Sequence, residues 1–504
     1  MIEILDTTLR DGEQTSGVSF SSQEKLEIAQ ALLNDMMVDR IEVASALVSE
    51  GEMVTVRRIS EWATRVGKLD RLEVLGFVDG ERSLNWIEKS GCRVVNLLCK
   101  GSLKHVTDQL RKSPEQHFAD ITDVVNRAIE RDFQVNVYLE DWSNGVIESP
   151  DYLFQMMDAL KLLPIKRIML PDTLGVLNPE STYKYCKLMI DRYPELKFDF
   201  HAHNDYDLAI ANVLSAVKAG IQGIHTTVNG LGERAGNAIL SSVLAVLKDH
   251  LAVDTHLNER KIMSVSRLVE ISSGVRIPQN KPIVGEYVFT QCAGIHADGD
   301  SKNNLYCNPL LPERFGRVRE YALGKNSGKA NIQLNLEAMG IELDEESMRK
   351  VTQRITELGD KKEQVTQEDL PYIISDVLHH DTLDEQKIRL LNYSMSLAQG
   401  LKPQAALKIE INGTAYENSA SGDGQYDAFV KALRKIYTDL GKPFPMLTNY
   451  YVSIPPGGRT DALVQTIISW NFAGLDFKTR GLDADQIEAA IKATMKMLNK
   501  IETI

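Results

Sequence analysis

The chain has 504 residues, of which 43% are hydrophobic and 25% are charged, and its formal net charge is −13. These values are typical of a folded globular protein of more than one domain. Lysines and arginines are scattered among acidic residues and form no basic stripe, which argues against a nucleic-acid surface. No apolar stretch approaches the roughly 18 residues that a membrane-spanning helix needs.

The N-terminus and the cysteines indicate the cellular compartment. The opening stretch MIEILDTTLRDG has the pattern of a strand and lacks the basic and apolar regions of a signal peptide. The five cysteines form no CxxC pair and are odd in number: Cys92, Cys99, Cys186, Cys292 and Cys307. We therefore expect a cytoplasmic location with reduced, mostly buried thiols.

Short β-rich segments alternate with amphipathic helical stretches from residue 1 to about 250. The eight expected strands are residues 2–7, 40–45, 72–78, 94–99, 135–140, 167–172, 198–203 and 223–228. Between the first two, SSQEKLEIAQALLNDM has a serine N-cap and apolar residues at helical spacing. Eight such βα units predict an α/β fold, a (β/α)8 TIM barrel over residues 1–260, with an open doubly wound sheet as the alternative.

The remainder of the chain has a different pattern. Residues 261–385 contain a loop-rich stretch with GIHADG, followed by helices from about 328 to 380, and we expect connector subdomains there. Within residues 386–504, two segments each combine a β-hairpin with a helix. This weak duplication predicts a separate C-terminal α+β domain with two similar halves.

Polar residues end several of the predicted strands, where the active site of a (β/α)8 barrel lies. They are Arg10, Asp11, Glu140, Asp172, Thr173, His201, His203 and Asn229. His201 and His203 are two positions apart in one strand, so their side chains point the same way. Two imidazoles and a carboxylate from another strand suit a first-row divalent ion. The alternative is that both are ordinary strand residues.

Four motifs together resemble one family, the acyltransferases that condense acetyl-CoA with a 2-oxo acid: the isopropylmalate, homocitrate and citramalate synthases. These motifs are LRDGEQTSGVSFSSQEK (9–25), HAHND (201–205), NGLGERAGN (229–237) and GIHADG (294–299). Further stretches, VYLEDWSNG, LPDTLGVL, HADGDSKNNLY and LPERFGR, look most like the bacterial citramalate synthases. Two positions depart from the family pattern. Asp207 stands where glycine is usual, and TQCAGIH stands where leucine-pathway enzymes usually read HESGIH.

The resemblance implies a metal site. Asp11, His201 and His203 would be the protein ligands of a divalent ion (Mn²⁺, Zn²⁺ or Mg²⁺), with Asn237 completing or supporting the set. The ion would chelate the 2-oxo acid and polarise its carbonyl group. Arg10 would then stabilise the negative charge that develops on oxygen.

The resemblance also implies substrate contacts and proton transfer. Thr173 would donate a hydrogen bond to the substrate carboxylate, and Gln14 would line the same site. Glu140 and His296, helped by Tyr306, would remove a proton from the acetyl methyl group. In the related enzymes the connector histidine reaches the barrel of the neighbouring subunit, so a homodimer is implied.

Three inward-facing positions bear on the choice of oxo acid. Leu75, Leu98 and Tyr138 lie near the ends of the third, fourth and fifth predicted strands. Beside a metal they would leave a small apolar slot, fit for pyruvate and tight for 2-oxoisovalerate. Alternatively, they are plain residues of the barrel interior. These three residues match the citramalate synthases, and this resemblance implies pyruvate as the oxo acid and (R)-citramalate synthesis for isoleucine as the expected activity.

Other functions stay open at this point. A 2-isopropylmalate synthase is the main alternative, a 3-hydroxy-3-methylglutaryl-CoA lyase-type enzyme is another, and a non-catalytic amino-acid sensor is a third. The C-terminal domain resembles the family's allosteric module, which implies feedback inhibition, here by isoleucine. Tyr426, Asp427, Leu447 and Tyr450 are the residues expected near the effector.

Overall fold

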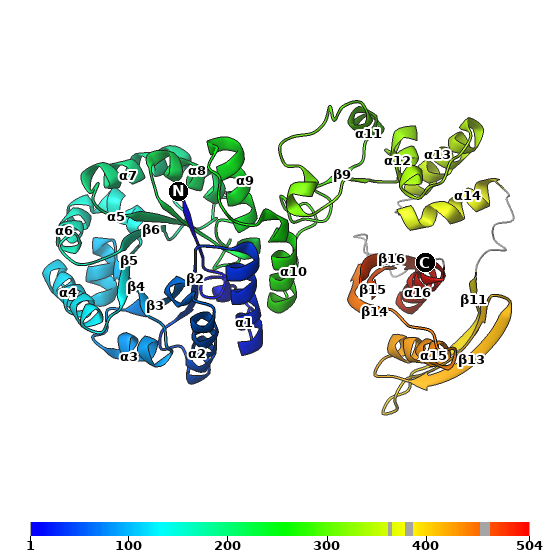
Figure 1. The fold of residues 1–504 in the computed structure, drawn as a ribbon, viewed down its shortest axis with the longest axis horizontal. Coiled ribbons are helices and arrows are strands. Elements are labelled where there is room, and N and C mark those ends of the chain that lie inside the picture. The colour runs from blue at the N-terminus through cyan, green and yellow to red at the C-terminus, as the bar shows by residue number, and fades with distance from the viewer. Residues whose placement is uncertain (1, 361–364, 379–386, 454–463, 503–504) are drawn as a thin grey trace. The chain divides into compact units, whose positions relative to one another are not determined.

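A closed barrel of parallel strands forms the N-terminal part of the computed structural model, which describes residues 2–360, 365–378, 387–453 and 464–502 (Figure 1). Its strands are β1 (Glu3–Asp6), β2 (Arg40–Ser45), β3 (Leu72–Phe77), β4 (Val94–Lys100), β5 (Gln134–Glu140), β6 (Arg167–Asp172), β7 (Phe198–Ala202) and β8 (Gly223–Thr226). They pair in chain order, and β8 pairs with β1. The predicted barrel is confirmed, and the open doubly wound sheet is excluded.

Helices surround the barrel on its outside (Figure 1). They are α1 (Ser22–Gln30), α2 (Glu50–Arg65), α3 (Arg82–Lys89), α4 (Pro114–Glu130), α5 (Trp142–Glu148), α6 (Pro150–Leu160), α7 (Pro179–Arg192), α8 (Ala209–Ala219), α9 (Leu240–Leu251) and α10 (Ile262–Ser273). Local sequence fixes several of their starts. Ser21 and Glu24 form a reciprocal capping box at α1, and Ser113 caps α4 ahead of Pro114.

The interior of the barrel begins with a layer of charged side chains at the N-terminal ends of the strands. Arg40 donates hydrogen bonds to Glu73 (2.9 Å) and Asp199 (2.5 Å). Arg167 donates to Asp199 (2.9 Å) and pairs with Glu3. All but Glu3 are buried. Buried charges need such partners, because desolvation costs several kcal/mol per ion.

An apolar layer lies above these ion pairs and below the mouth of the barrel. It consists of Leu5, Leu75, Tyr138 and Met169, with Leu98 packed against them. Outside the strands a second apolar shell joins the sheet to the helices and includes Ile4, Val43, Val137 and Phe200. The alternation of inward and outward residues along each strand separates these two regions.

The chain divides into two compact units. One comprises the chain up to Thr290 together with Tyr306–Glu320, and the other comprises Gln291–Leu305 and the chain from Tyr321 onward. The division falls within β9 (Thr290–Gln291) and β10 (Glu320–Tyr321), which pair in a two-stranded sheet, and the second unit begins with four helices. These are α11 (Gly294–Ser301), α12 (Lys329–Ala338), α13 (Glu345–Asp360) and α14 (Leu370–Leu378).

Two three-stranded antiparallel sheets, each followed by a helix, form the C-terminal part of the second unit. The first set is β11 (Ile388–Ser396), β12 (Gln404–Ile411), β13 (Thr414–Ser421) and α15 (Gln425–Asp439). The second is β14 (Met446–Ser453), β15 (Val464–Phe472), β16 (Leu475–Asp483) and α16 (Gln486–Ile501). Each half thus has one strand more than the hairpin predicted from the sequence. Positive φ angles at Asn412–Gly413 and Ala473–Gly474 give both hairpins the same tight turn.

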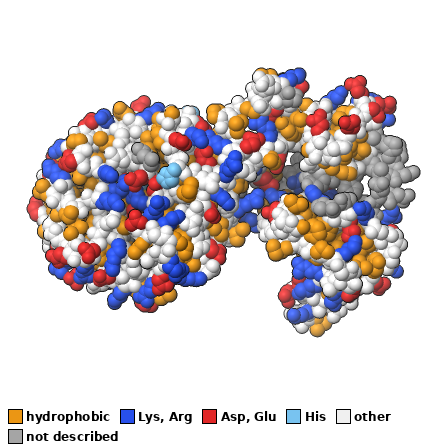
Figure 2. All heavy atoms as spheres, in the orientation of Figure 1, with side chains coloured by type: hydrophobic (Ala, Val, Ile, Leu, Met, Phe, Trp, Pro, Cys, Tyr) orange, Lys and Arg blue, Asp and Glu red, His pale blue; other side chains and the backbone are white. Residues whose placement is uncertain are grey.

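Several further expectations can be set against the structure. The predicted domain boundary at residues 385 and 386 lies outside the described residues, and that at 260 stays a prediction. None of the five cysteines forms a disulfide; Cys92, Cys99 and Cys186 are buried, Cys307 is half-buried and Cys292 is exposed. Among the described residues, no helix combines the length and apolar character needed to cross a bilayer. Charges of both signs are interspersed over the barrel face seen in Figure 2.

The charged layer at the base of the barrel gives a stability prediction. Replacing Arg40 by Met should lower the free energy of unfolding of the barrel by about 3–5 kcal/mol, because Glu73 and Asp199 would lose a buried partner. Urea unfolding followed by tryptophan fluorescence reports mainly on the barrel, which holds Trp62, Trp86 and Trp142 of the four tryptophans.

The matched control is Arg93→Met. Arg93 pairs with Glu88 at 3.8 Å, and both side chains are nearly half exposed. Its loss should cost about 1 kcal/mol or less. Equal destabilisation by the two variants would show that the buried network contributes no more than a surface ion pair.

Candidate active site

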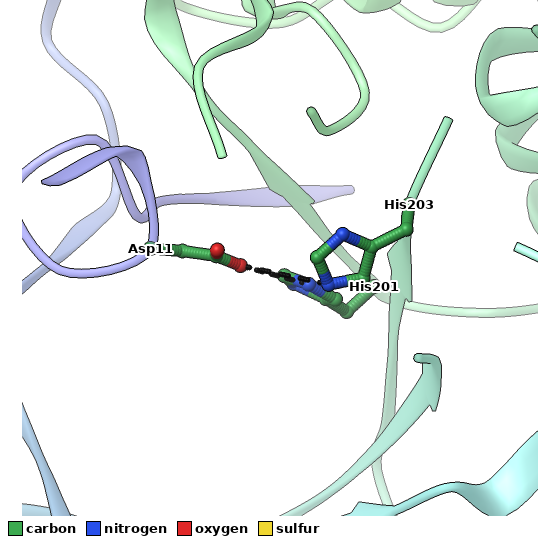
Figure 3. A group of neighbouring side chains, drawn as sticks. All are labelled: Asp11, His201 and His203. Carbon is green, nitrogen blue, oxygen red and sulfur yellow. Dashed lines mark ion pairs between the residues drawn. The ribbon is translucent and has the colours of Figure 1, made fainter. Parts of the chain in front are cut away.

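Asp11, His201 and His203 meet at the mouth of the barrel (Figure 3). Asp11 lies in the loop after β1, His201 near the end of β7, and His203 directly after β7. The Nε2 atom of His201 is 3.1 Å from Asp11 Oδ2, and that of His203 is 3.9 Å from the same oxygen. All three side chains are buried. The strand period and the closure of the barrel together create this convergence.

The donor atoms of this cluster fit a divalent metal ion. Within the described part of the chain, neither carboxylate oxygen of Asp11 has a hydrogen-bond partner, and the same holds for Oδ1 of buried Asn237. A buried carboxylate without donors is unfavourable unless a cation compensates it. Two imidazole nitrogens and carboxylate oxygen form a donor set suited to first-row divalent ions. The cluster can therefore hold such an ion.

The electrostatics of the cluster keep its donor atoms available. Burial opposes ionisation of Asp11, but Arg10 and the two histidines outweigh it and hold the pKa of that carboxyl well below its usual range. Burial and the neighbouring His201 lower the pKa of His203 to about 4, and burial also lowers the pKa of His201. At neutral pH the carboxylate is ionised and both imidazoles are neutral, as metal binding requires.

Glycines of NGLGERAGN bring Asn237 to the cluster. The residue pairs with His203 in an isolated β-bridge, and its Nδ2 donates to the carbonyl of Leu231 (3.0 Å), which leaves Oδ1 free of protein donors. Gly232 and Gly236 have positive φ angles, and a Cβ atom on either would clash, at Gly232 with the Asn237 amide itself. These glycines are therefore needed for the placement of Asn237.

The departure at Asp207 has a conformational explanation. Its φ is +59°, in the left-handed region that glycine adopts without cost. Aspartate tolerates this region better than most residues. Asp207 also accepts a hydrogen bond from the Asn204 side chain (3.1 Å), and its amide donates to the Asn204 carbonyl (2.9 Å). The carboxylate thus stabilises the turn that follows the two histidines.

Hydrogen bonds link two of the sequence motifs beside the cluster of Asp11, His201 and His203. Arg234 of NGLGERAGN donates to Asp205 of HAHND (2.7 Å) and to the backbone carbonyl of Thr173 (2.7 Å). The hydroxyl oxygen of Thr173 accepts the amide of Asp141 (2.9 Å). Its hydroxyl hydrogen thereby stays available for a ligand in the mouth of the barrel.

Arg10 is held in the interior by a carboxylate that motif reasoning did not identify. Its Nε donates to Glu42 (2.5 Å), which also accepts from Asn96 (2.7 Å). The guanidinium lies 3.5 Å from both the Gln14 side-chain oxygen and the Tyr138 hydroxyl. It is also 3.6 Å from Asp11. Arg10 therefore joins the metal cluster to the predicted substrate slot.

Glu140 ends β5 opposite Lys100, which ends β4. The two side chains form a close ion pair, with Lys100 buried and Glu140 about one quarter exposed. Behind them the Lys100 amide donates to Nε2 of buried His117 (3.2 Å), whose pKa burial lowers to about 4. A carboxylate fixed by a buried ammonium group and open to the mouth of the barrel is suitably placed for proton transfer.

The predicted slot residues share one cluster. Leu75 and Tyr138 are buried in the apolar layer, and Leu98 packs against it. The Tyr138 hydroxyl also contacts His225 Nδ1 (2.9 Å), and its ring lies edge-on to His201. The layer thus directly adjoins the metal cluster.

Two predicted catalytic residues and the effector residues belong to other segments of the chain. His296 is on α11 in the second unit, and Tyr306 begins the short segment that returns to the first. In the C-terminal part, the rings of Tyr426 and Tyr450 are 5.3 Å apart, Leu447 packs against the core, and Asp427 pairs with Lys431 (2.7 Å). Their predicted roles stay predictions.

Several polar residues of the site were missed in the sequence. Glu42, Asn96, Lys100 and His225 all lie on strands and point inward. The sequence does contain a pattern that could have identified them, since each is a polar residue at an inward-facing position of an otherwise apolar strand. Their partners could not be predicted from the sequence, because each partner lies on another strand or loop of the barrel.

Comparison with known proteins places this geometry in a family. The sequence profile described as HMGL-like matches residues 1–269, which contain the barrel and the cluster of Asp11, His201 and His203. The chain belongs to the HMGL-like family. Two further profiles match the rest: "Homocitrate synthase post-HMGL domain-like" over residues 283–363, and "LeuA allosteric (dimerisation) domain" over residues 364–502.

Relatives of this HMGL-like protein cover nearly its whole length. A putative (R)-citramalate synthase of Methanopyrus kandleri is 36% identical over 92% of this chain and 88% of its own. An (R)-citramalate synthase of Methanocaldococcus jannaschii is 34% identical over 99% of both chains. A probable 2-isopropylmalate synthase of M. kandleri is also 34% identical, over 99% of this chain and 98% of its own. The resemblance to the citramalate and isopropylmalate synthase group is confirmed.

The pKa of His203 gives a prediction for metal binding by this HMGL-like protein. Protons compete with the metal for His203 only near its lowered pKa of about 4, and burial also lowers the pKa of His201, so the affinity for Mn²⁺ should fall much less from pH 7 to pH 5 than it would with two ordinary histidines. An ordinary histidine, with a pKa of about 6.5, would lose affinity from that pH downward. Isothermal titration calorimetry at pH 7, 6 and 5 measures this.

The control is His203→Asn, which should weaken binding at every pH. A roughly tenfold loss of affinity in the wild-type protein for each pH unit below 6.5 would contradict the prediction.

Proposed function

We propose that the protein is an (R)-citramalate synthase, which condenses acetyl-CoA with pyruvate and water to give citramalate and CoA. The observation that carries this proposal is the buried Asp11, His201 and His203 cluster beside Arg10 and a small apolar slot. Relatives named (R)-citramalate synthase, matched over most of the chain, support it. Isoleucine biosynthesis is the pathway that this activity would serve.

The 2-oxo acid would bind at the cluster, with Asp11, His201, His203 and Asn237 holding a divalent ion. The ion would supply Lewis-acid polarisation of the substrate carbonyl. Thr173 would donate its free hydroxyl hydrogen to the substrate carboxylate, since its oxygen already accepts the Asp141 amide. Gln14, at the Arg10 guanidinium, would line the same side.

The residues around the cluster would carry out the condensation. Glu140, fixed by Lys100, would take a proton from the methyl group of acetyl-CoA, and the resulting carbanion would attack the keto carbon of pyruvate. Arg10 would stabilise the negative charge that develops on oxygen. Hydrolysis of the thioester would then release CoA, with His296 and Tyr306 as the partners of Glu140 in proton transfer.

The slot is the basis for choosing pyruvate. Leu75, Leu98 and Tyr138 would enclose the methyl group, and 2-oxoisovalerate would add two further methyl groups to a packed layer. Overpacking of this kind costs about 1–3 kcal/mol. The alternative, a 2-isopropylmalate synthase, draws on the relative of that name at 34% identity. A 3-hydroxy-3-methylglutaryl-CoA lyase-type activity is disfavoured by the LeuA allosteric (dimerisation) domain at residues 364–502.

The oxo-acid preference is the decisive test. Thiol release from acetyl-CoA should be at least tenfold more efficient, in kcat/KM, with pyruvate than with 2-oxoisovalerate, because the slot discriminates by size. Exhaustive chelation should abolish the activity with either acid. A clear preference for 2-oxoisovalerate would instead identify a 2-isopropylmalate synthase, and activity that survives chelation would refute the metal-dependent mechanism.

We further propose that the C-terminal domain mediates homodimerisation and feedback inhibition by isoleucine. The match to the LeuA allosteric (dimerisation) domain supports both parts. Tyr426 connects α15 to α16 through a hydrogen bond to Thr494 (2.8 Å), so an effector near it could change how the two helices pack. Tyr450 on β14 stacks obliquely on the same ring.

This regulation predicts selective inhibition. Isoleucine at millimolar concentration should reduce the initial rate several-fold, whereas leucine should have a smaller effect. Tyr450→Ala should weaken the inhibition without lowering the uninhibited rate, because Tyr450 is in the second unit, outside the barrel that holds the metal cluster. Equal inhibition by leucine, or none by either amino acid, would refute the assignment of isoleucine.

A further inference from the structure

A chain of buried polar contacts runs through the barrel interior, from its charged base to Arg10 at the mouth. Asp199 Oδ2 lies 3.3 Å from His225 Nε2, and His225 Nδ1 lies 2.9 Å from the Tyr138 hydroxyl. That hydroxyl lies 3.5 Å from Arg10 Nη2. Asp199, His225 and Tyr138 are each 3% exposed or less. Neither Asp199 nor His225 has a part in the proposed function, and His225 is the one that contacts the slot residue Tyr138.

The surroundings of Asp199 fix the direction of every hydrogen bond in the chain. Arg40 and Arg167 donate to its two oxygens at 2.5 and 2.9 Å, and a carboxylate between two guanidinium groups can only accept. The His225 Nε2 therefore donates to Asp199. Burial favours the neutral ring, so Nδ1 accepts, and the Tyr138 hydroxyl must be the donor to it.

The fixed direction has a consequence for the slot. With its hydrogen directed at His225, the Tyr138 oxygen presents its lone pairs to Arg10. The ring of Tyr138 is thereby tied at its far end, while its base is fixed on β5. A wall residue anchored at both ends cannot swing aside to admit a larger oxo acid.

We propose that His225 is a positioning residue for oxo-acid selectivity, which acts by anchoring Tyr138 against Arg10 and the leucines of the slot. This inference rests on the proposed function, because Tyr138 is assigned there to the substrate slot. Simple packing is the competing explanation for His225, whose ring also lies edge-on to those of Tyr138 and His201. Packing needs a ring of this size, whereas anchoring needs a hydrogen-bond acceptor at Nδ1.

Two variants separate these requirements. His225→Phe keeps a planar ring but removes the acceptor, and Asp199 keeps its two arginine partners. His225→Asn loses the ring but offers an amide oxygen near the position of Nδ1. The selectivity is the ratio of kcat/KM for pyruvate to that for 2-oxobutanoate, which is larger by one methylene group.

His225→Phe should lower this ratio about five- to tenfold, the effect expected from one neutral hydrogen bond. His225→Asn should stay within about twofold of the wild type. In the Tyr138→Phe background, where no hydroxyl remains to be anchored, adding His225→Phe should change the ratio less than twofold. If His225→Phe lowers both activities equally, or if its effect adds fully to that of Tyr138→Phe, His225 only packs and the inference is wrong.

A second measurement does not depend on turnover. In NMR spectra of protein labelled with ¹⁵N-histidine, the signal of His225 is identified as the one that disappears in His225→Asn. In the wild type this signal should be that of a neutral ring protonated at Nε2. Tyr138→Phe should shift the Nδ1 resonance of the same ring. A ring protonated at Nδ1, or at both nitrogens, would overturn the anchoring. A wild-type protein that releases no CoA with any oxo acid would defeat the proposed function, yet the labelled protein would still decide whether His225 anchors Tyr138.

Discussion

Closure of the barrel between β1 and β8 is the constraint on which the candidate site depends. The parallel pairing of Asp6 with Thr226 brings the first strand beside the last. The loop after β1 then reaches across the mouth, so that Asp11 faces the two histidines of β7. An open sheet would leave the first and last strands at its edges. The side chains of Asp11, His201 and His203 could not then converge.

A polar interior is the second consequence of this closure. Most barrel interiors are filled with branched apolar residues, but here an apolar layer is sandwiched between a charged base and a charged mouth. Buried charges are tolerated because each has partners from neighbouring or opposite strands, as Arg40 shows. Such a network fixes side-chain orientation more sharply than apolar packing does, because each hydrogen bond has a direction. Arg10 is therefore held in a preorganised position by Glu42.

The second unit is built on a different principle. Its C-terminal part repeats a three-stranded sheet and a helix, and residues from both repeats share one core. The helices α15 and α16 each cover a sheet and also contact each other through Tyr426 and Thr494, so the two repeats are coupled by direct packing. A duplicated domain of this kind is well suited to convert ligand binding into a conformational change, whereas the closed barrel is suited to keep its inward-facing side chains in fixed positions.

The sequence by itself determined the elements and the faces they present. Strand and helix periods, caps and turns are local, so the eight strands were predicted to within one or two residues. The two-residue period of β7 made His201 and His203 co-facial before any partner was known. The resemblance to the family then supplied Asp11 and Asn237 as their partners, and the structure brings both to the two histidines.

Only the tertiary structure decided which distant polar residues meet. Lys100 and Glu140 belong to different strands, as do His225 and Tyr138, and Glu42 of β2 meets Arg10 of the loop after β1. Their pairing depends on the relative register of strands and on the tilt that closes the barrel, and neither is encoded in a local pattern. The conformation of Asp207 could not be predicted from the sequence for a related reason, since its positive φ angle is set by the turn around the residue. The sequence thus determined which side chains point inward, and the closed barrel decided which partners each of them contacts.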